Sequence, residues 1–149
     1  MSLIVRQAHI GDLDDLAPLF DDYRQFYGQT SDPVGARRFL FERFEHCESV
    51  VFIARTDDGA AVGFTQLYPA FSSTRMSRTY VLNDLFVTPQ GRGRGAGRAL
   101  LEAAAAFGRA MGAVELSLMT ARTNLVAQGL YRSAGWVLDE TYLTFELTL

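Results

Sequence analysis

A glycine-rich segment, 90–97, holds the residues of this 149-residue chain that most directly suggest chemistry. Glycines let a backbone turn freely and approach a ligand closely. The segment leads into a helix-like apolar pattern, and the N–H groups and dipole of a helix N-terminus favour an anion. Arg92, Arg94 and Arg98 add side chains that form charge-assisted hydrogen bonds to phosphate oxygens. These features predict a pyrophosphate cradle that needs no metal, although a flexible turn with solvated arginines would have the same composition.

Two other ligand classes fit this segment less well. Residues 91–96 match the loose dinucleotide-binding pattern G-x-G-x-x-A, but there the first glycine directly follows the strand, and here residues 88–90 intervene. Glu115, the only acidic residue at a suitable distance downstream, falls early in its predicted strand. An arginine–glycine arm for RNA would lie outside periodic structure. A dinucleotide-dependent oxidoreductase remains as the lesser alternative.

The composition excludes several other functions. All 14 basic residues are arginine, so the chain has no lysine for a Schiff base or a P-loop, and its net charge of -3 argues against nucleic-acid binding. His9, His46 and Cys47 are too few for a zinc site, and we predict no metal. One cysteine, and no apolar run that resembles a membrane span or a signal peptide, predict a cytoplasmic protein that is not membrane-bound.

The predicted elements place the glycine-rich segment between a strand and a helix. Strands are expected at 3–8, 50–55, 61–68, 80–87, 114–119, 136–139 and 142–147. Helices are expected at 11–27, from near Pro33 to Cys47, at 98–111 and at 125–134, with a polar loop at 71–78. This order, β-α-α-β-β-β-α-β-α-β-β, predicts a single α/β (α+β) domain, 1–149, with a mixed sheet and helices on both faces.

Two signatures resemble the GNAT superfamily of acyl-CoA-dependent N-acetyltransferases. Residues 92–97, RGRGAG, are similar to its R/Q-x-x-G-x-G/A motif. Residues 124–136, NLVAQGLYRSAGW, are similar to its N-x-x-A-x-x-L-Y-x-x-x-G-F/W ending. The element order is also similar, so the resemblance covers nearly the whole chain and implies a mostly antiparallel mixed sheet. Residues 68–73 and 82–87 look most like the polyamine and histone-type branch.

The resemblance implies acetyl-CoA as co-substrate. The strand ending at Val87 would splay from the next strand and pair with the pantetheine arm like an added strand, and the N–H groups of 92–97 would hold the pyrophosphate. Asn124 would contact the cofactor and begin a helix as its N-cap, although capping alone would explain this residue. The cofactor-binding residues implied in this way are Leu85, Phe86, Val87, Arg92, Gly93, Arg94, Gly95, Ala96, Gly97, Arg98, Asn124 and Tyr131.

The resemblance also implies an acid but leaves the base open. Tyr131 matches the family's general acid, whose phenol protonates the leaving CoA thiolate. The similar polyamine enzymes carry an acidic residue at the position of Asn83, which cannot accept a proton. Asp84 is adjacent, but strand alternation predicts that it faces the other side of the sheet. Asp84 is therefore predicted either as the base or as a buried structural carboxylate, with a water chain or an already neutral acceptor as other routes.

The acceptor site is expected between the two N-terminal helices and the loop 71–78. Aromatic faces beside Asp21 and Asp22 suit a cationic amine, although core aromatics beside a solvated acidic face fit equally well. The predicted substrate-binding residues are Tyr23, Phe26, Tyr27, Tyr68, Phe71 and Asn83.

The leading hypothesis is acetyl transfer from acetyl-CoA to a primary amine, a small molecule or a peptide, by direct attack in a ternary complex. The absence of an acid at Asn83 keeps a non-catalytic acyl-CoA-binding, regulatory module as the alternative. Terminal strands in the similar enzymes often pair across a two-fold axis. The apolar residues of 142–147 therefore predict a homodimer.

Overall fold

The computed structural model describes residues 2–149 as two units, 2–119 and 120–149. The first unit contains β1 (Leu3–Gln7), the 3-10 turn η1 (Ile10–Asp12), α1 (Leu13–Phe26), α2 (Pro33–Glu45), β2 (Val50–Thr56), β3 (Ala61–Ser72), β4 (Ser77–Val87), the 3-10 turn η2 (Pro89–Gly91), α3 (Ala96–Ala110) and β5 (Glu115–Ser117). The second contains α4 (Leu125–Ser133). Within 2–149, none of the helices combines the length and apolar character that crossing a membrane requires.

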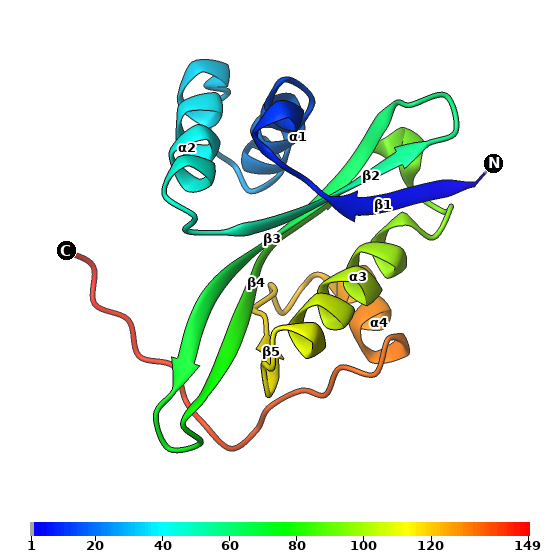
Figure 1. Ribbon diagram of the computed structural model, residues 1–149. Coiled ribbons are helices and arrows are strands. Elements are labelled where there is room, and N and C mark those ends of the chain that lie inside the picture. The colour runs from blue at the N-terminus through cyan, green and yellow to red at the C-terminus, as the bar shows by residue number, and fades with distance from the viewer. Residues whose placement is uncertain (1) are drawn as a thin grey trace. The chain divides into compact units, whose positions relative to one another are not determined.

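Five strands of the first unit form one mixed sheet in the order β1-β2-β3-β4-β5 (Figure 1). Neighbouring strands are antiparallel, except that β5 runs parallel to β4. α1 and α2 lie on one face of this sheet and α3 on the other. The predicted α/β class, with a mostly antiparallel mixed sheet between helices, is confirmed.

Each face of the sheet has its own apolar core. On the α1 side, Leu16 and Phe20 lie one turn apart on the helix and belong to the same buried cluster as Phe64 of β3. On the α3 side, the ring of Phe107 meets the ring of Phe52 of β2 edge-on, with 5.7 Å between centroids. Alternating side chains of the same strands supply both cores.

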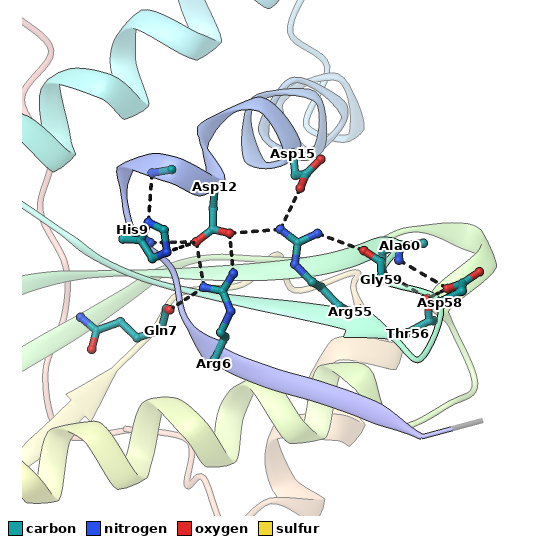
Figure 2. Close-up of polar contacts among 11 residues, drawn as sticks. Arg6, Gln7, His9, Asp12, Asp15, Arg55, Thr56, Asp58, Gly59 and Ala60 are labelled. Atoms are coloured by element: carbon teal, nitrogen blue, oxygen red, sulfur yellow. Dashed lines mark hydrogen bonds and ion pairs between the residues drawn. The ribbon is translucent and has the colours of Figure 1, made fainter.

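A buried carboxylate of η1 joins β1 and β2 (Figure 2). Asp12, at the end of η1, accepts hydrogen bonds from both terminal nitrogens of Arg6 of β1, at 2.8 and 2.6 Å. It also accepts one from Arg55 of β2 at 3.1 Å, and Arg55 pairs with Asp15 of α1 at 2.7 Å. Hydrogen bonding to Arg6 holds the pKa of Asp12 well below its usual range. This cluster fixes the start of α1 against the sheet.

The segment predicted as a polar loop, 71–78, is instead the tip of a long β-hairpin. β3 continues to Ser72 and β4 begins at Ser77, so only residues 73–76 form the turn. Phe71 pairs directly with Arg78 across the hairpin, and the guanidinium lies over the ring at 5.2 Å. Cross-strand cation–π pairs of this kind extend a hairpin beyond its apolar core.

The second unit consists of α4 and an extended tail. Asn124 caps α4 as predicted, by accepting a hydrogen bond from the N–H of Ala127 at 3.2 Å. The predicted strands at 136–139 and 142–147 are wrong. A strand needs a neighbour for its N–H and C=O groups, and the second unit, taken by itself, contains no strand that pairs with this segment. Its apolar side chains are exposed, Phe145 by 90%.

Candidate functional site

A pocket of about 480 Å³ lies where α1 and α2 meet β3 and β4. Four aromatic side chains line it: Phe20, Tyr23, Phe39 and Tyr68. Its charged and amide side chains are Arg24, Asp32, Arg38, Glu42, Asn83 and Asp84. A concave site of this volume, with apolar walls and a few polar groups, suits a small ligand.

Three of the six predicted substrate-binding residues line this pocket: Tyr23, Tyr68 and Asn83. Phe26 and Tyr27 join Tyr23 in a chain of edge-on ring contacts but are not among the lining residues. They are 57% and 51% exposed. Phe71 does not line the pocket either, because it lies at the tip of the β3–β4 hairpin and is 71% exposed. The sequence pattern thus identified the aromatic surface but not which rings turn inward.

One of the two acidic residues expected to attract the acceptor amine, Asp21, has a structural role. Its carboxylate accepts hydrogen bonds from the hydroxyl of Ser31 at 2.7 Å and from the backbone N–H of Asp32 at 2.8 Å. These bonds, that from Ser31 first, lower the pKa of Asp21. Asp21 therefore holds the segment that connects α1 to α2 against α1.

A β-bulge in β4 brings two consecutive side chains to the pocket. Gln66 of β3 pairs with Asp84, but the next residue, Leu67, pairs with Leu82, so Asn83 is an extra residue on the β4 side. An extra residue reverses the alternation of side chains along a strand. Asn83 and Asp84 consequently both line the pocket. The prediction that Asp84 faces the opposite side of the sheet from Asn83 is wrong for this reason.

Asp84 is a buried carboxylate held by neutral donors. It is 2% exposed. The side-chain amide of Gln66 donates to Oδ2 at 2.6 Å, and that of Asn83 donates to Oδ1 at 2.8 Å. In the described chain, no arginine or histidine forms an ion pair with it. Burial raises the pKa of Asp84, because the charged form loses its hydration without gaining a counter-charge.

Two tyrosines stand close to this carboxylate. Tyr23 donates its hydroxyl to the main-chain oxygen of Asn83 at 3.2 Å. Burial, and then the charge of Asp84, raise the pKa of Tyr23. The same two causes raise the pKa of Tyr68 to about 12. Both phenols therefore stay protonated at neutral pH and act as hydrogen-bond donors in the pocket.

The glycine-rich segment forms an open turn before α3. Gly93 and Gly95 have φ angles of 73° and 81°, in the left-handed region, and no atom lies within 4 Å of where a Cβ would stand. Gly95 is the N-cap of α3, and no side chain caps the helix there. Gly91 has a different role, because a Cβ there would stand 2.9 Å from Val62. The geometry of Gly93 and Gly95 fits an anionic ligand lying against the backbone at a helix N-terminus.

The arginines of this segment already have protein partners. Arg92 donates to the main-chain oxygen of Val87 at 3.2 Å. Arg98 pairs with Glu102, one turn along α3, at 3.0 Å. The charge of Arg94 contributes to lowering the pKa of Asp58. A phosphate ligand would share these guanidinium groups with the protein rather than find them unengaged.

The last part of β4 has a strand on one edge only. β5 pairs with β4 only at Thr79–Val81, whereas β3 follows β4 as far as Val87. The next residues of β4, including Leu85 and Phe86, therefore lack a second neighbouring strand within the described chain. An extended ligand can add to such an edge through main-chain hydrogen bonds.

Tyr131 and Asn124 belong to the second unit. The ring of Tyr131 lies 6.2 Å from that of Trp136, and the main-chain oxygen of Tyr131 accepts a hydrogen bond from the N–H of Trp136 at 3.0 Å. Gly135, with a φ of 89°, makes the turn between them. These contacts position the Tyr131 side chain within its own unit.

Sequence reasoning missed most of the residues that α1 and α2 contribute to the pocket, among them Phe20, Phe39 and Glu42. It also missed Gln66, which holds Asp84 from β3. Phe20 of α1 and Phe39 and Glu42 of α2 lie at helical spacings that are equally typical of core or surface positions. Gln66 carried a signal, because it is an amide inside the apolar run 62–68 and is fully buried. A buried polar residue in such a run indicates a specific partner, which here is Asp84.

The family model described as "Acetyltransferase (GNAT) family" matches residues 16–136, from α1 to the end of the turn after α4. The chain belongs to this family. An uncharacterised N-acetyltransferase of Bacillus subtilis, YhfO, is 46% identical over 145 residues, 97% of each chain. An aminoglycoside N(6')-acetyltransferase of Stenotrophomonas maltophilia is 31% identical over 113 residues, 74% of each chain.

Solved structures agree with this membership. A crystal structure of a probable acetyltransferase, 38% identical, superposes with a TM-score of 0.93 over 100% of this chain and 98% of its own. The aminoglycoside acetyltransferase AAC(6')-Iy, bound to a bisubstrate analogue of CoA, shares the fold with a TM-score of 0.80 at 22% identity over 100% of both chains. The GNAT resemblance of 92–97 and 124–136 is thereby confirmed. None of these four relatives is named as a polyamine or histone acetyltransferase, so the resemblance to that branch is not confirmed.

No metal centre accompanies this GNAT site in the part of the chain that is described. Between residues 2 and 149, no three His, Cys, Asp or Glu side chains gather as a metal ion would require. The chemical groups at the pocket are one buried carboxylate, two phenols, amides and the charged side chains of α1 and α2.

Proposed function

We propose that this GNAT protein transfers the acetyl group of acetyl-CoA to a primary amine by direct attack, with no covalent enzyme intermediate. Asp84 carries the proposal. It is a buried carboxylate that has neutral hydrogen-bond donors but no cation, and it lines a ligand-sized pocket. Buried charges are normally paired. An ammonium group of the acceptor would supply the missing counter-charge.

Asp12 is the internal contrast for this argument. It is buried to a similar extent, 4% against 2% exposed, yet two arginines neutralise it. Asp12 is a structural carboxylate by this criterion, and Asp84 is not. The position of Asp84 also weakens the case for a non-catalytic acyl-CoA-binding module, since that alternative rested on the lack of an acid at Asn83.

The proposed reaction balances with the groups named. The acceptor ammonium gives one proton to Asp84, and the neutral nitrogen attacks the thioester carbonyl. The carbon–sulfur bond breaks and CoA leaves as a thiolate, which takes a proton from the phenol of Tyr131. The nitrogen loses its second proton as the amide forms, and this proton restores the Tyr131 phenol. Asp84 releases its own proton to solvent before the next turnover. The raised pKa of Asp84 favours the first step, because a stronger base takes the proton more readily.

Acetyl-CoA is the proposed donor, with the groups implied by the family signatures as its binding residues. The left-handed Gly93 and Gly95 and the uncapped N-terminus of α3 support a pyrophosphate site. At Leu85, Phe86 and Val87, β4 has a neighbouring strand on one edge only, and the unpaired edge supports a pantetheine site. Asn124 is proposed as a further contact, in addition to its capping role.

A small-molecule amine is the proposed acceptor. The aminoglycoside relative and the pocket volume support a small molecule. The polyamine-like residues of 82–87 keep polyamines, and a peptide amine, in the set to be tested.

We also propose that both units form one domain and that the chain acts as a cytoplasmic homodimer. The family match from 16 to 136 spans both units and supports the single domain. The exposed apolar side chains of the tail, among them Leu143, Phe145 and Leu147, support pairing with a second copy, which would cover them.

The test is CoA release in the presence of an amine panel. Acetyl-CoA and the protein are incubated with an aminoglycoside, a polyamine, an amino acid and a lysine peptide, and CoA and the acetylated amine are measured by chromatography. Chromatography is preferable to a thiol reagent because Cys47 is an exposed free thiol. Stoichiometric CoA and acetylated amine are expected. Acetyl-CoA binding without turnover on any amine would favour the non-catalytic module instead.

A further inference from the structure

Gln66 of β3 is the one side chain that holds Asp84 from the neighbouring strand. It is fully buried, and its Nε2 donates to Oδ2 of Asp84 at 2.6 Å. Its other polar atom, Oε1, is buried without a hydrogen-bond partner among the described residues. An unsatisfied buried amide oxygen is costly, so this arrangement calls for a compensating role.

The amide of glutamine can pair with either state of a carboxyl group. An ionised carboxylate accepts only, so it requires Nε2 to face it. A protonated carboxyl also donates, and a half-turn of the amide then brings Oε1 to accept that proton. The two ends of the amide are nearly equal in size, so the same buried space accommodates both orientations. Oε1 of Gln66 is therefore the acceptor that protonated Asp84 needs.

We propose that Gln66 is a positioning residue that keeps Asp84 hydrogen-bonded in both of its protonation states. With Asp84 ionised, Nε2 of Gln66 donates to it, as the structure has it. With Asp84 protonated, Oε1 accepts from it. This cycle rests on the proposed function, in which Asp84 gains and loses a proton at each turnover, whereas the stabilisation of ionised Asp84 by Gln66 does not.

The other groups around Asp84 define what a Gln66 variant leaves in place. Asn83 still donates to Oδ1, and Tyr23 and Tyr68 remain on the α1 and β3 sides. The charged lining residues are Arg24 of α1, Asp32 at the start of α2, and Arg38 and Glu42 of α2, and Arg43 lies near enough to Tyr68 to influence its pKa. These groups are common to wild type and variants, so a change in the titration of Asp84 reports on position 66.

The experiment is a carboxyl titration of the whole chain by carbon-13 NMR with labelled aspartate. Asp84→Asn identifies the Asp84 signal by its loss. Gln66→Met keeps a similar side-chain length but can neither donate to ionised Asp84 nor accept from protonated Asp84. The hydrogen bond to the charged form is the stronger of the two, so its loss outweighs the other, and Asp84 should bind its proton about tenfold more tightly, with a correspondingly higher titration midpoint. Gln7→Met, the same change at an exposed site on β1, should leave the midpoint where it is in wild type.

A second variant keeps the proposal testable if Gln66→Met does not fold. Gln66→Glu has nearly the shape of the native side chain but places two carboxyl groups against each other. The pair should then titrate in two separated steps, because one proton is shared between them. An Asp84 midpoint equal to that of wild type in a folded Gln66→Met or Gln66→Glu variant would overturn the proposal.

Kinetics separate this inference from the proposed function. If amines are acetylated, the acidic limb of the kcat/KM profile should move to higher pH in Gln66→Met, so that the loss of kcat/KM is larger at acidic than at alkaline pH. A uniform loss of kcat at every pH, without movement of the limb, would indicate a merely structural role and overturn the proposal. If no amine is acetylated, the proposed function fails, and the NMR titration still decides whether Gln66 stabilises ionised Asp84.

Discussion

Two of the buried aspartates of the first unit, Asp12 and Asp84, should respond in opposite ways to the same substitution. Asp84→Asn is expected to remove turnover and leave stability intact, whereas Asp12→Asn is expected to remove stability and leave turnover per folded molecule intact. The two side chains are buried alike, 2% and 4% exposed. The comparison therefore isolates the effect of the counter-charge, which only Asp12 has.

The activity loss in Asp84→Asn follows from the proposed role as base. Removing a general base typically costs about 10²- to 10⁴-fold in rate, which is about 3–5 kcal/mol of transition-state stabilisation. Asparagine has the shape of aspartate but cannot take a proton from the acceptor ammonium. Acetyl-CoA binding should be near that of wild type, because the proposed donor site lies on the glycine-rich turn and the edge of β4.

The stability of Asp84→Asn follows from the raised pKa of Asp84. A carboxyl whose folded pKa is above its unfolded value destabilises the fold as pH rises above the unfolded pKa. Asparagine removes this penalty, and Gln66 can present its Oε1 to the new amide. The free energy of unfolding at pH 7 to 8 should therefore equal or exceed that of wild type, with a smaller gain at acidic pH.

The ionised side chain of Asp12, in contrast to that of Asp84, stabilises the fold. Its pKa is lowered, first by the hydrogen bonds from Arg6, so its stabilisation is present above the unfolded pKa and is lost as pH falls. Breaking a buried ion pair costs about 3–5 kcal/mol, but the Arg6 side chain is 43% exposed and can regain water. We therefore expect a loss of about 2 kcal/mol in Asp12→Asn, or roughly 4–8 °C in Tm for a chain of this size.

The assay combines urea unfolding at pH 5 and pH 8 with initial rates on the best acceptor. The wild-type minus Asp12→Asn difference should be nearly the same at pH 5 and pH 8, because both lie above the unfolded pKa of Asp12, and it should shrink only when the pH falls below that pKa. Destabilisation of Asp84→Asn by more than about 1 kcal/mol would mean that Asp84 is a structural carboxylate. Wild-type turnover in Asp84→Asn at neutral pH would equally refute the assignment of Asp84 as base.

Three further outcomes are expected. Tyr131→Phe should lower kcat at least tenfold and leave acetyl-CoA binding, measured by calorimetry, unchanged; full turnover would remove Tyr131 from the mechanism. Gly95→Ala should weaken acetyl-CoA binding about tenfold, because the left-handed φ strains the turn and the new Cβ would stand in the open space proposed for the pyrophosphate. Gly59→Ala, with a similarly left-handed φ in the β2–β3 turn, should lower stability alone. Light scattering should give a dimer for wild type and a smaller species for Phe145→Asp; a wild-type monomer would contradict the proposed dimer.

Local patterns were sufficient for most of the fold. The apolar spacing of 11–27 and 98–111 predicted α1 and α3, and Asn124 caps α4 as its type and position suggested. These features depend on residues within one or two turns of each other, where propensity and capping act directly. The tail shows the limit of this reasoning. The alternation in 142–147 is typical of a strand, yet pairing depends on a partner that a local pattern does not contain.

The site depended on one feature that alternation cannot express. Asn83 and Asp84 were placed on opposite faces because successive strand residues normally alternate. The bulge at Asn83 adds one residue to β4, and it is set by the register between Gln66 and Leu67 on the other strand. With regular alternation along β4, Asn83 and Asp84 would face opposite sides of the sheet. The β4 wall of the pocket would then present Asn83 but no carboxylate. The bulge thus brings a carboxylate to the pocket one position along the strand from Asn83, and Gln66 at the same register step is the amide that donates a hydrogen bond to it.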